Sequence, residues 1–429
     1  MTRRPAYAKV LYSFSFSACL SLSNAWSYLN QAKGYFGSYS MGVGGPANNF
    51  VPAISYWAQP KPHGGGASTY TIPSGVLMPG SAKSPSPLAN SSGDGGFAFM
   101  MQTHSWGSWV YEVASLQQTG PNTTIGFGAG GFQEARGGKG TGSFYLSHRK
   151  ELLDAENEWF LDKKADMLYF GVTQGGTPPA ALFASQVDQL FRLSGTQEKP
   201  VKDVRISSLT LKHTQPTYMA NHSVGSGGDY AVHRGAAITL IGTENVTIDH
   251  NLLDGLGGNG VWLHSYNRKA LIAGNEMRNM GDNGVGFTGE TVWVDGTGGN
   301  QPRFNEVSGN LIHHVGIYTK QSSAVFHAVS CQNTIKENVF FHGPRALFNM
   351  NDDFGGDTKV VSNLFFKSLL ETHDHGPYNS WDRLPFLTKV LNGTATIDSA
   401  YNHLTANMFF SGSPFSIDTD DGSDRVNCT

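Results

Sequence analysis

Two short stretches near the end of the chain bring together side chains that could perform acid–base chemistry. The first contains Asp352 and Asp353, and the second contains Asp374 next to His375. Paired carboxyl groups suit glycoside hydrolysis, because one held protonated assists the leaving group while the other, ionised, acts as base or nucleophile. Crowding of like charges separates the pKa values of two such groups. We therefore expect Asp352 or Asp353 to act with Asp374 as the catalytic carboxylates.

Neighbouring polar and aromatic side chains are the expected substrate contacts. Trp and Tyr rings can pack on the face of a sugar, and Arg can bind hydroxyl groups or a uronate carboxylate. The predicted substrate-binding residues are Lys320, Gln321, Arg345, Asn351, His375, Tyr378, Trp381 and Arg383. Structural alternatives stay open, since the aspartates at 352 and 353 could bind Ca²⁺ and Arg383 could pair with Asp382. We predict no other metal and no cofactor, because the histidine spacings are not those of a zinc site.

A repeated phrase in the second half of the chain indicates which elements position these residues. Each copy has a β-branched residue or Leu, two or three further residues, an Asn and then apolar residues. The Asn residues of the six copies are Asn251, Asn275, Asn310, Asn338, Asn363 and Asn407. Their spacings are 24, 35, 28, 25 and 44 residues, and the last is close to two ordinary periods. A copy without the Asn precedes them at 204–211.

Short strands that recur at such a period predict a solenoid, in which each turn of the chain stacks on the next. An Asn at a fixed corner predicts a ladder of side-chain amides between successive rungs. We therefore predict an all-β, right-handed parallel β-helix over residues 201–429. Equal offsets from the ladder Asn then place Gln321, Asn349, Asp374 and Asp418 in one polar strip. No cap follows the last copy of the phrase, so we expect the solenoid to be truncated at its C-terminus.

The first 200 residues do not show this repeated Asn phrase. Residues 26–200 are predicted to form an irregular β-rich region packed on the solenoid. Its expected strands are 97–101, 109–113 and 124–127, followed by a hairpin of 158–161 with 167–170. Residues 1–25 fit two interpretations. Basic residues, an apolar stretch and a small-residue cleavage pattern indicate a secretory signal, whereas alternation of apolar residues with Ser indicates a half-buried strand.

Composition excludes several classes of protein. Charged residues make up 15% of the chain and aromatic residues 12%, which argues against disorder. The net charge of −3 gives no sign of nucleic-acid binding, and no apolar run is long enough to cross a membrane. Three widely spaced cysteines do not suggest a disulfide framework. Six Asn-x-Ser/Thr sequons, together with the candidate signal, favour a secreted, extracellular protein.

Several motifs carry a resemblance to known proteins. They are Gly131–Gly137, Glu151–Asp154 with Glu158–Asp162, Gly228–Ala237, Gly316–Gln321 and the acidic stretches at 343–356 and 371–383. Together they resemble a widespread group of right-handed parallel β-helix, pectin-lyase-like proteins that is similar to glycoside hydrolase family 141, with its α-fucosidase and xylanase types. The resemblance implies paired catalytic aspartates on late rungs, and the matching positions are Asp352 or Asp353 and Asp374. The group usually has Asn-Asp-Gly where this chain has Asn-Asp-Asp at 351–353.

Three functions remain open at this stage. The leading one is a secreted carbohydrate-active enzyme, a glycoside hydrolase that binds a polysaccharide or oligosaccharide in a groove along the β-helix. The second is a polysaccharide lyase or uronate epimerase, in which His375, Lys320 and Arg345 supply the base and neutralise a carboxylate. The third is a non-catalytic carbohydrate-binding or adhesion β-helix. Dependence on Ca²⁺ and an unsaturated product distinguish a lyase from a hydrolase.

Overall fold

The computed structural model forms two compact units, residues 1–186 and 187–429. It describes residues 96–102, 106–133, 141–149, 157–172, 176–177, 179–224, 231–290, 296–351, 355–372, 375–381, 386–388, 397–413, 415–420 and 423–429, and the backbone of short strands at 12–13, 33–34 and 69–73. Within these residues no helix is long and apolar enough to cross a membrane.

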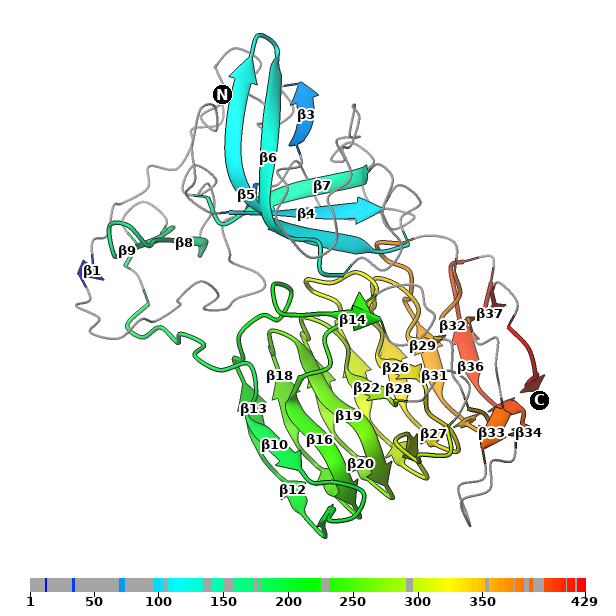
Figure 1. The fold of residues 1–429 in the computed structure, drawn as a ribbon. Helices are drawn as coiled ribbons and strands as arrows, with labels where there is room; N and C mark the ends of the chain where they lie inside the picture. Colours follow the sequence, from blue (N-terminus) through cyan, green and yellow to red (C-terminus); the bar gives the residue numbers. More distant parts are fainter. Residues whose placement is uncertain are drawn as a thin grey trace. The chain divides into compact units, whose positions relative to one another are not determined.

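The second unit is a solenoid of three parallel β-sheets, which the chain visits in the order sheet 1, sheet 2, sheet 3 on every turn (Figure 1). Sheet 1 contains β10 (Phe191–Ser194), β16 (Ala236–Glu244), β19 (Asn259–Arg268), β22 (Val285–Thr288), β26 (Val325–Ala328), β29 (Phe348–Asn351), β32 (Tyr378–Trp381) and β37 (Ile417–Thr419), with β11 (Val201–Lys202) on β16 and β23 (Pro302–Arg303) on β19. Sheet 2 contains β12 (Arg205–Ser207), β17 (Thr247–Asp249), β20 (Leu271–Ala273), β24 (Glu306–Ser308), β27 (Thr334–Lys336), β30 (Lys359–Val361), β35 (Asn402–Thr405) and β38 (Val426–Cys428). Sheet 3 contains β13 (Thr210–Lys212), β18 (Leu252–Asp254), β21 (Glu276–Arg278), β25 (Leu311–His313), β28 (Val339–Phe341), β31 (Leu364–Phe366) and β36 (Met408–Phe410).

This arrangement confirms the predicted all-β, right-handed parallel β-helix and changes two details. The first strand of the solenoid, β10, already pairs with β16 from Phe191, ten residues before the predicted start at 201. The 44-residue interval between Asn363 and Asn407 holds one rung, because β31 pairs directly with β36. The prediction of two periods there was wrong, since an inserted hairpin of β33 (Phe386–Thr388) and β34 (Ile397–Ser399) occupies the extra length.

Alternation along each short strand fills the interior of the solenoid. In sheets 2 and 3 the middle residue of each three-residue strand points inward, while the residues on either side face outward. The inward column of sheet 2 is Ile206, Ile248, Ile272, Val307, Ile335, Val360 and Leu404. The inward column of sheet 3 is Leu211, Leu253, Met277, Ile312, Phe340, Phe365 and Phe409. Each such side chain contributes roughly 1.5–3 kcal/mol when it is fully buried, so the stack is held mainly by this core.

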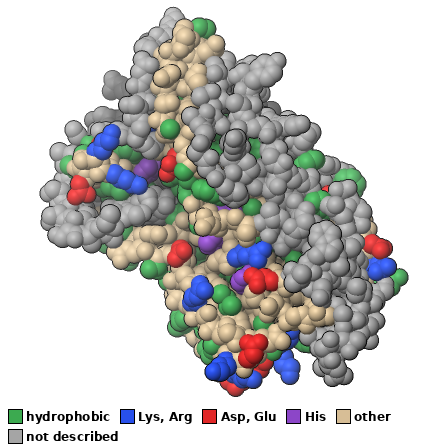
Figure 2. Space-filling view, viewed as in Figure 1, with side chains coloured by type: hydrophobic (Ala, Val, Ile, Leu, Met, Phe, Trp, Pro, Cys, Tyr) green, Lys and Arg blue, Asp and Glu red, His purple; other side chains and the backbone are tan. Residues whose placement is uncertain are grey.

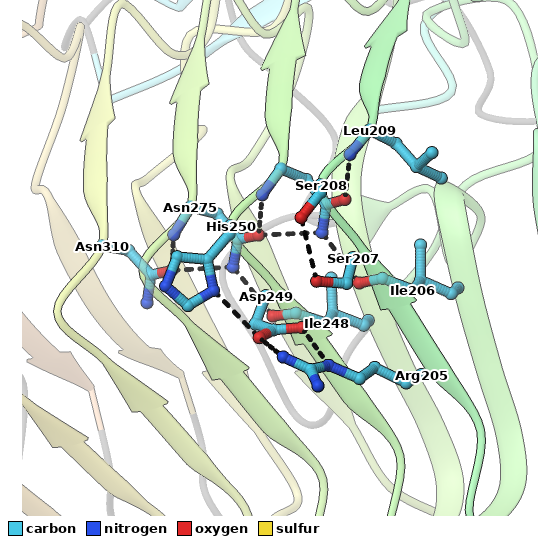
Figure 3. Close-up of polar contacts among 11 residues, drawn as sticks. Arg205, Ile206, Ser207, Ser208, Leu209, Ile248, Asp249, His250, Asn275 and Asn310 are labelled. Carbon is cyan, nitrogen blue, oxygen red and sulfur yellow. Dashed lines mark hydrogen bonds and ion pairs between the residues drawn. The ribbon is translucent and has the colours of Figure 1, made fainter.

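The repeated Asn forms the predicted ladder at the corner between sheets 2 and 3 (Figure 3). The side-chain oxygen of Asn275 accepts hydrogen bonds from the backbone and side-chain N–H groups of Asn251, both at 3.0 Å. The same pair of bonds joins Asn275 to Asn310, and the pattern continues without a break to Asn407. In the first rung the backbone N–H of Leu209 bonds to Asn251, which explains how a copy without Asn begins the stack.

Ion pairs join rungs on the outer surface. The Arg205 guanidinium of the first rung contacts both carboxylate oxygens of Asp249 on the next, and the His250 ring contacts the same carboxylate at 2.9 Å (Figure 3). The hydrogen bonds from Arg205, opposed by burial, hold the pKa of Asp249 well below its usual range. These contacts on the outer surface support the same register between rungs that the buried Asn ladder fixes.

The three corners of the solenoid differ in how much their length varies. Two residues always separate a sheet 2 strand from the sheet 3 strand that follows, as 274 and 275 do between β20 and β21. The first of the two has a positive φ in every rung from His250 onward, and the second is the ladder Asn. The connections on both sides of sheet 1 instead range from two residues between β16 and β17 to a span that holds the hairpin β33–β34. Variable connections therefore border sheet 1 alone, and they are where binding residues are expected.

The first unit contains two antiparallel sheets. The larger has the order β2-β7-β4-β5-β6-β3, with strands β2 (Lys33–Gly34), β3 (Thr69–Pro73), β4 (Phe97–Gln102), β5 (Ser108–Thr119), β6 (Asn122–Gly130) and β7 (Thr141–Ser147). The smaller pairs β8 (Trp159–Asp162) with β9 (Met167–Phe170), and β9 with β1 (Tyr12–Ser13). The predicted strands and hairpin of this region are confirmed, although β5 and β6 extend further. The rest of residues 1–25 lies outside the described residues.

Candidate active site

The outer face of sheet 1 changes character along the solenoid. Inward residues of its strands belong to the core, so the residues between them face outward. The strand register aligns one outward column, which consists of Thr239, Trp262, Gly286, Phe326, Asn349, Asn379 and Asp418. The column is apolar at Trp262 and Phe326 and carries amide or carboxylate groups over the last three rungs. The late rungs are therefore the part of this face that carries polar groups able to take part in a reaction.

This register corrects the predicted polar strip. Asn349 and Asp418 do lie in one column, but Phe326 and Asn379 take the places expected for Gln321 and Asp374. The connections that lead from sheet 3 into sheet 1 differ in length from rung to rung, so a fixed offset from the ladder Asn does not reach the same column.

A buried histidine–arginine pair lies in the connections that enter these late strands. Arg345, which precedes β29, is fully buried, and His375, which precedes β32, is 3% exposed. The Arg345 Nη2 atom is 2.6 Å from His375 Nε2. A guanidinium can only donate, so Nε2 accepts and the imidazole carries its proton on Nδ1. The Ser413 hydroxyl donates to the His375 backbone carbonyl at 2.8 Å, which fixes the backbone at this residue.

Two half-buried carboxylates complete the cluster. Asp418 lies on β37 and accepts a hydrogen bond from Asn379 Nδ2 at 3.1 Å. Asp420 follows the strand, and its backbone N–H donates to the Ser380 carbonyl at 2.8 Å. One oxygen of each carboxylate and one ring nitrogen of His375 lie within 4.8 Å of one another. We call His375, Asp418, Asp420 and Arg345 the late-rung cluster.

The late-rung cluster can be read as a metal site or as an acid–base site. Within the described residues, His375, Asp418 and Asp420 are close enough together to share one metal ion. A metal needs a ring nitrogen with a free lone pair, but the Arg345 contact uses that of Nε2 and leaves the proton on Nδ1. A neighbouring guanidinium also disfavours a cation. The hydrogen bond therefore favours acid–base chemistry, in which Nδ1–H can donate toward a carboxylate.

Lys320 is held in a buried ion pair. Its ammonium group is 2.9 Å from Glu371 Oε1 and also donates to the carbonyls of Gly316 and Ile317, at 2.9 and 3.0 Å. The Lys320 side chain is only 5% exposed. Three partners match the three N–H donors of an ammonium group, so the pair fastens the connection before β26 to the connection before β32.

The other predicted binding residues occupy different places. Tyr378 belongs to the inward column, is fully buried and stacks on Phe348 with ring centroids 5.4 Å apart. Trp381 and Asn351 are paired in register in the second outward column, where both side chains are buried. Gln321 is buried in the connection that precedes β26. Asp352, Asp353, Asp374 and Arg383 lie outside the described residues, so their roles stay predictions from the sequence.

Sequence reasoning gave no role to Asp420 or Glu371. Both lie within acidic stretches that the sequence makes visible, Glu371 four residues before His375 and Asp420 two residues after Asp418. A spacing of two on a strand places side chains on the same face, so the Asp418–Asp420 pair was available as a signal.

The fold and these contacts define the class, a right-handed parallel β-helix with a polar cluster on the outer face of its late rungs. No family model and no curated protein sequence matches the chain. One similar solved structure, described as "Glycoside hydrolase", has a TM-score of 0.60 and 15% sequence identity, over 79% of this chain and 62% of its own. The chain thus spans less than two thirds of that protein's length. Another, "The complex structure of XylC with xylose", has a TM-score of 0.31 and 11% identity, over 82% and 55%.

Proposed function

We propose that this protein is a secreted carbohydrate-active enzyme, a glycoside hydrolase that binds a polysaccharide at the late rungs of the solenoid. The observation that carries the proposal is the late-rung cluster, in which two half-buried carboxylates and a buried His lie within 4.8 Å of one another. Hydrolysis of a glycosidic bond requires two carboxyl groups in different protonation states, and two carboxylates this close favour a state in which only one is ionised. Similarity to a glycoside hydrolase in fold adds a supporting analogy.

In this proposal one carboxyl group of the cluster protonates the oxygen of the leaving sugar, and the other acts as nucleophile or base. His375 donates from Nδ1 toward the ionised carboxylate, and Arg345 is a positioning residue that fixes the imidazole tautomer. Asp374, the residue before His375, and Asp352 or Asp353, which follow Asn351, remain proposed catalytic carboxylates on the basis of the sequence.

The test is release of reducing sugar from a panel of polysaccharides by the full chain. Asp418→Asn removes an acid–base group while it keeps the shape of the side chain, so we expect activity to fall by at least about a hundredfold. Asp374→Asn is measured beside it to test the prediction from the sequence. Asp424→Asn, at an exposed carboxylate paired with Arg425, is the matched control and should retain full activity. Equal activity of Asp418→Asn and the control would contradict the role of the cluster.

A polysaccharide lyase is the second candidate, because His375, Asp418 and Asp420 have the spacing of metal ligands and a cation there would neutralise a uronate. The contact of Arg345 with His375 opposes such a cation, so the lyase ranks below the hydrolase. The same assay separates the two functions. A hydrolase gives reducing sugar without an unsaturated product, and we expect a chelator to leave its rate unchanged. Absorbance of an unsaturated product that disappears with chelator would establish the lyase.

A further inference from the structure

A second polar site lies at the other end of the same face, on the first turns of the solenoid. It is a cavity of about 300 Å³, and its lining includes Asp188, Arg192, Asn221, His222, His233 and Arg234. Figure 2 shows Lys or Arg and His side chains gathered on a face of the solenoid, with acidic side chains among them. We call this cavity the early-rung pocket. None of its residues belongs to the late-rung cluster.

Three segments converge to build the early-rung pocket. Asp188 lies just before β10, and Arg192 lies on it. Asn221 and His222 lie before β14 (Ser223–Val224), and His233 and Arg234 lie between β15 (Ala231–Val232) and β16. The last two segments are fastened to each other, because His233 Nδ1 contacts the Asn221 carbonyl at 2.9 Å.

The wall is also fastened to the next rung. Asn259 on β19 donates from Nδ2 to the carbonyls of His233 and Gly235, both at 2.8 Å. A Cβ atom at Gly235 would lie 2.5 Å from His233 Nε2, so a glycine at this position leaves room for the imidazole. The pocket is therefore built before any ligand arrives, which lowers the entropy cost of binding.

The charges of the pocket favour an anion. Two guanidinium groups, Arg192 and Arg234, line it against one carboxylate, Asp188. The Arg192 side chain is exposed. His222 is buried, which lowers its pKa to about 4 even though Asp282 favours its charged form, so it is a neutral donor or acceptor at pH 7.

Two more carboxylates lie behind the pocket, Asp282 near His222 and Glu290 near Arg234. With Asp188 they outnumber the two guanidinium groups, so the preference for an anion depends on the guanidinium groups that line the cavity and not on the net charge around it.

Burial lowers the pKa of Arg234, and the charge of Glu290 opposes this effect. Glu290 also lies 3.2 Å from His264 Nε2, and its own side chain is half exposed. Arg192 and Arg234 both lower the pKa of His264, after burial, which has the larger effect. His264 is therefore neutral and adds no positive charge, and Arg192 remains the cation available to a ligand from solvent.

We propose that the early-rung pocket is a subsite for the anionic group of an acidic glycan, a uronate carboxylate or a sulfate ester, with Arg192 and Arg234 as its principal contacts. Planar guanidinium groups bind such oxygens in a fixed geometry.

The inference rests on the proposed function, because one long substrate would have to reach both sites. In the outward column between them, Trp262, Phe326 and Asn349 are at most 1% exposed, so such a substrate spans the distance without contacting that column. Six rung steps separate β16 from β37, which places the pocket roughly 30 Å from the late-rung cluster. The substrate class is then an acidic polysaccharide several sugars long.

The experiment measures binding of the full chain to polygalacturonate and to the same polymer after reduction of its carboxyl groups. Dextran sulfate and dextran form the second matched pair. The variants are Arg192→Gln, Arg192→Lys and, as control, Lys359→Gln, which removes an exposed cation from the outer face of sheet 2. We expect wild type to prefer at least one charged polymer over its neutral partner. Arg192→Gln should lose roughly tenfold in affinity, Arg192→Lys less, and Lys359→Gln should bind as wild type does.

The polymer whose binding falls in Arg192→Gln identifies the anionic group as carboxylate or sulfate. Equal binding of charged and neutral polymers would overturn the proposal, as would equal losses in Arg192→Gln and Lys359→Gln. Binding does not depend on turnover, so the two proposals fail separately. An anion-selective Arg192 in a protein without hydrolase activity would overturn only the proposed function. Hydrolysis that requires Asp418, with binding indifferent to Arg192, would overturn only the subsite.

Discussion

At the residue scale, the side chain of the ladder Asn joins neighbouring rungs at a corner through both its oxygen and its nitrogen. Asn310 accepts from the backbone and side-chain N–H groups of Asn275 and donates to the Asn338 side chain and the Ile272 carbonyl, all near 2.9–3.0 Å. Every one of these groups is buried, so none can turn to water when its partner is removed.

We therefore expect Asn310→Ala to lower the free energy of unfolding by about 2–4 kcal/mol, because it leaves several buried polar groups without partners. Asn310→Asp should also destabilise, since its second oxygen would face the Ile272 carbonyl and the Asn338 side-chain oxygen. Urea denaturation followed by circular dichroism measures both. Asn427→Ala, at an exposed Asn on β38, is the control and should change stability by less than about 0.5 kcal/mol. A ladder variant as stable as this control would show that the amides are not needed.

Individual residues of the late-rung cluster could be predicted from the sequence only in part. Asp418, His375 and Arg345 were visible as polar residues on late rungs, and Asn349 and Asp418 lie in one column as predicted. The contact between Arg345 and His375 could not be foreseen, because the two residues are 30 positions apart in connections of unequal length. Tyr378 could not be assigned to the interior either, since its facing depends on the residue at which β32 begins.

At the element scale, the corner between sheets 2 and 3 requires one residue in the left-handed region of φ. Gly309 has φ of +60°, and a Cβ atom added there would meet nothing within 4 Å. The same corner position in other rungs is occupied by His250, Glu337 and Ser362, with φ between 53° and 58°. The conformation is therefore strained for a side chain but tolerated within the stack.

We expect Gly309→Ala to destabilise the solenoid by about 1 kcal/mol, which is the cost of the left-handed conformation alone. Gly298→Ala is the matched control, because a Cβ there also meets nothing within 4 Å and the backbone is not left-handed. That substitution should be neutral or slightly stabilising, since alanine restricts the unfolded chain. Chemical denaturation of the two variants gives the difference, and equal midpoints would contradict the argument.

Element recognition from the sequence succeeded where local chemistry repeats. The Asn phrase identified each turn between sheets 2 and 3, because a two-residue corner with a buried amide leaves a fixed signature. It failed at the 44-residue interval, where the inserted hairpin β33–β34 has a length close to that of a rung. Length alone cannot distinguish an insertion from a repeat when both consist of short strands.

At the scale of the whole molecule, buried histidines and paired carboxylates set how the solenoid responds to acid. Burial lowers the pKa of His222 to about 4 from 6.5, against the opposing charge of Asp282. Burial would raise the pKa of Asp254, but hydrogen bonds from Arg278, Asn279 and Lys212 outweigh it and lower the value to about 2.

Between pH 6.5 and about 4 the unfolded chain protonates His222 and the folded chain does not, so stability falls as the pH is lowered through this window. A shift of this size corresponds to roughly 3 kcal/mol at the lower end. Asp254 contributes stability that is present above pH 3.8 and is lost as the pH falls toward 2. We expect His222→Asn to make the dependence between pH 6.5 and 4 less steep and to leave the more acidic part unchanged. It does not abolish the dependence, because burial also lowers the pKa of His148 and of His314 to about 4. Urea midpoints at half-unit intervals measure this, and an unchanged slope in the variant would contradict it.

The constant corner between sheets 2 and 3 also bears on how such a molecule can evolve. A strand of three residues (four in β35), two corner residues and a second strand of three residues recur as one unit on successive rungs. Among the described residues, the longer connections all flank sheet 1. A duplicated rung would therefore enter in phase with its neighbours, and the outer face of sheet 1 would lengthen by one step of about 4.8 Å. The length of this face can therefore change by whole rungs without any change in the early-rung pocket or the late-rung cluster.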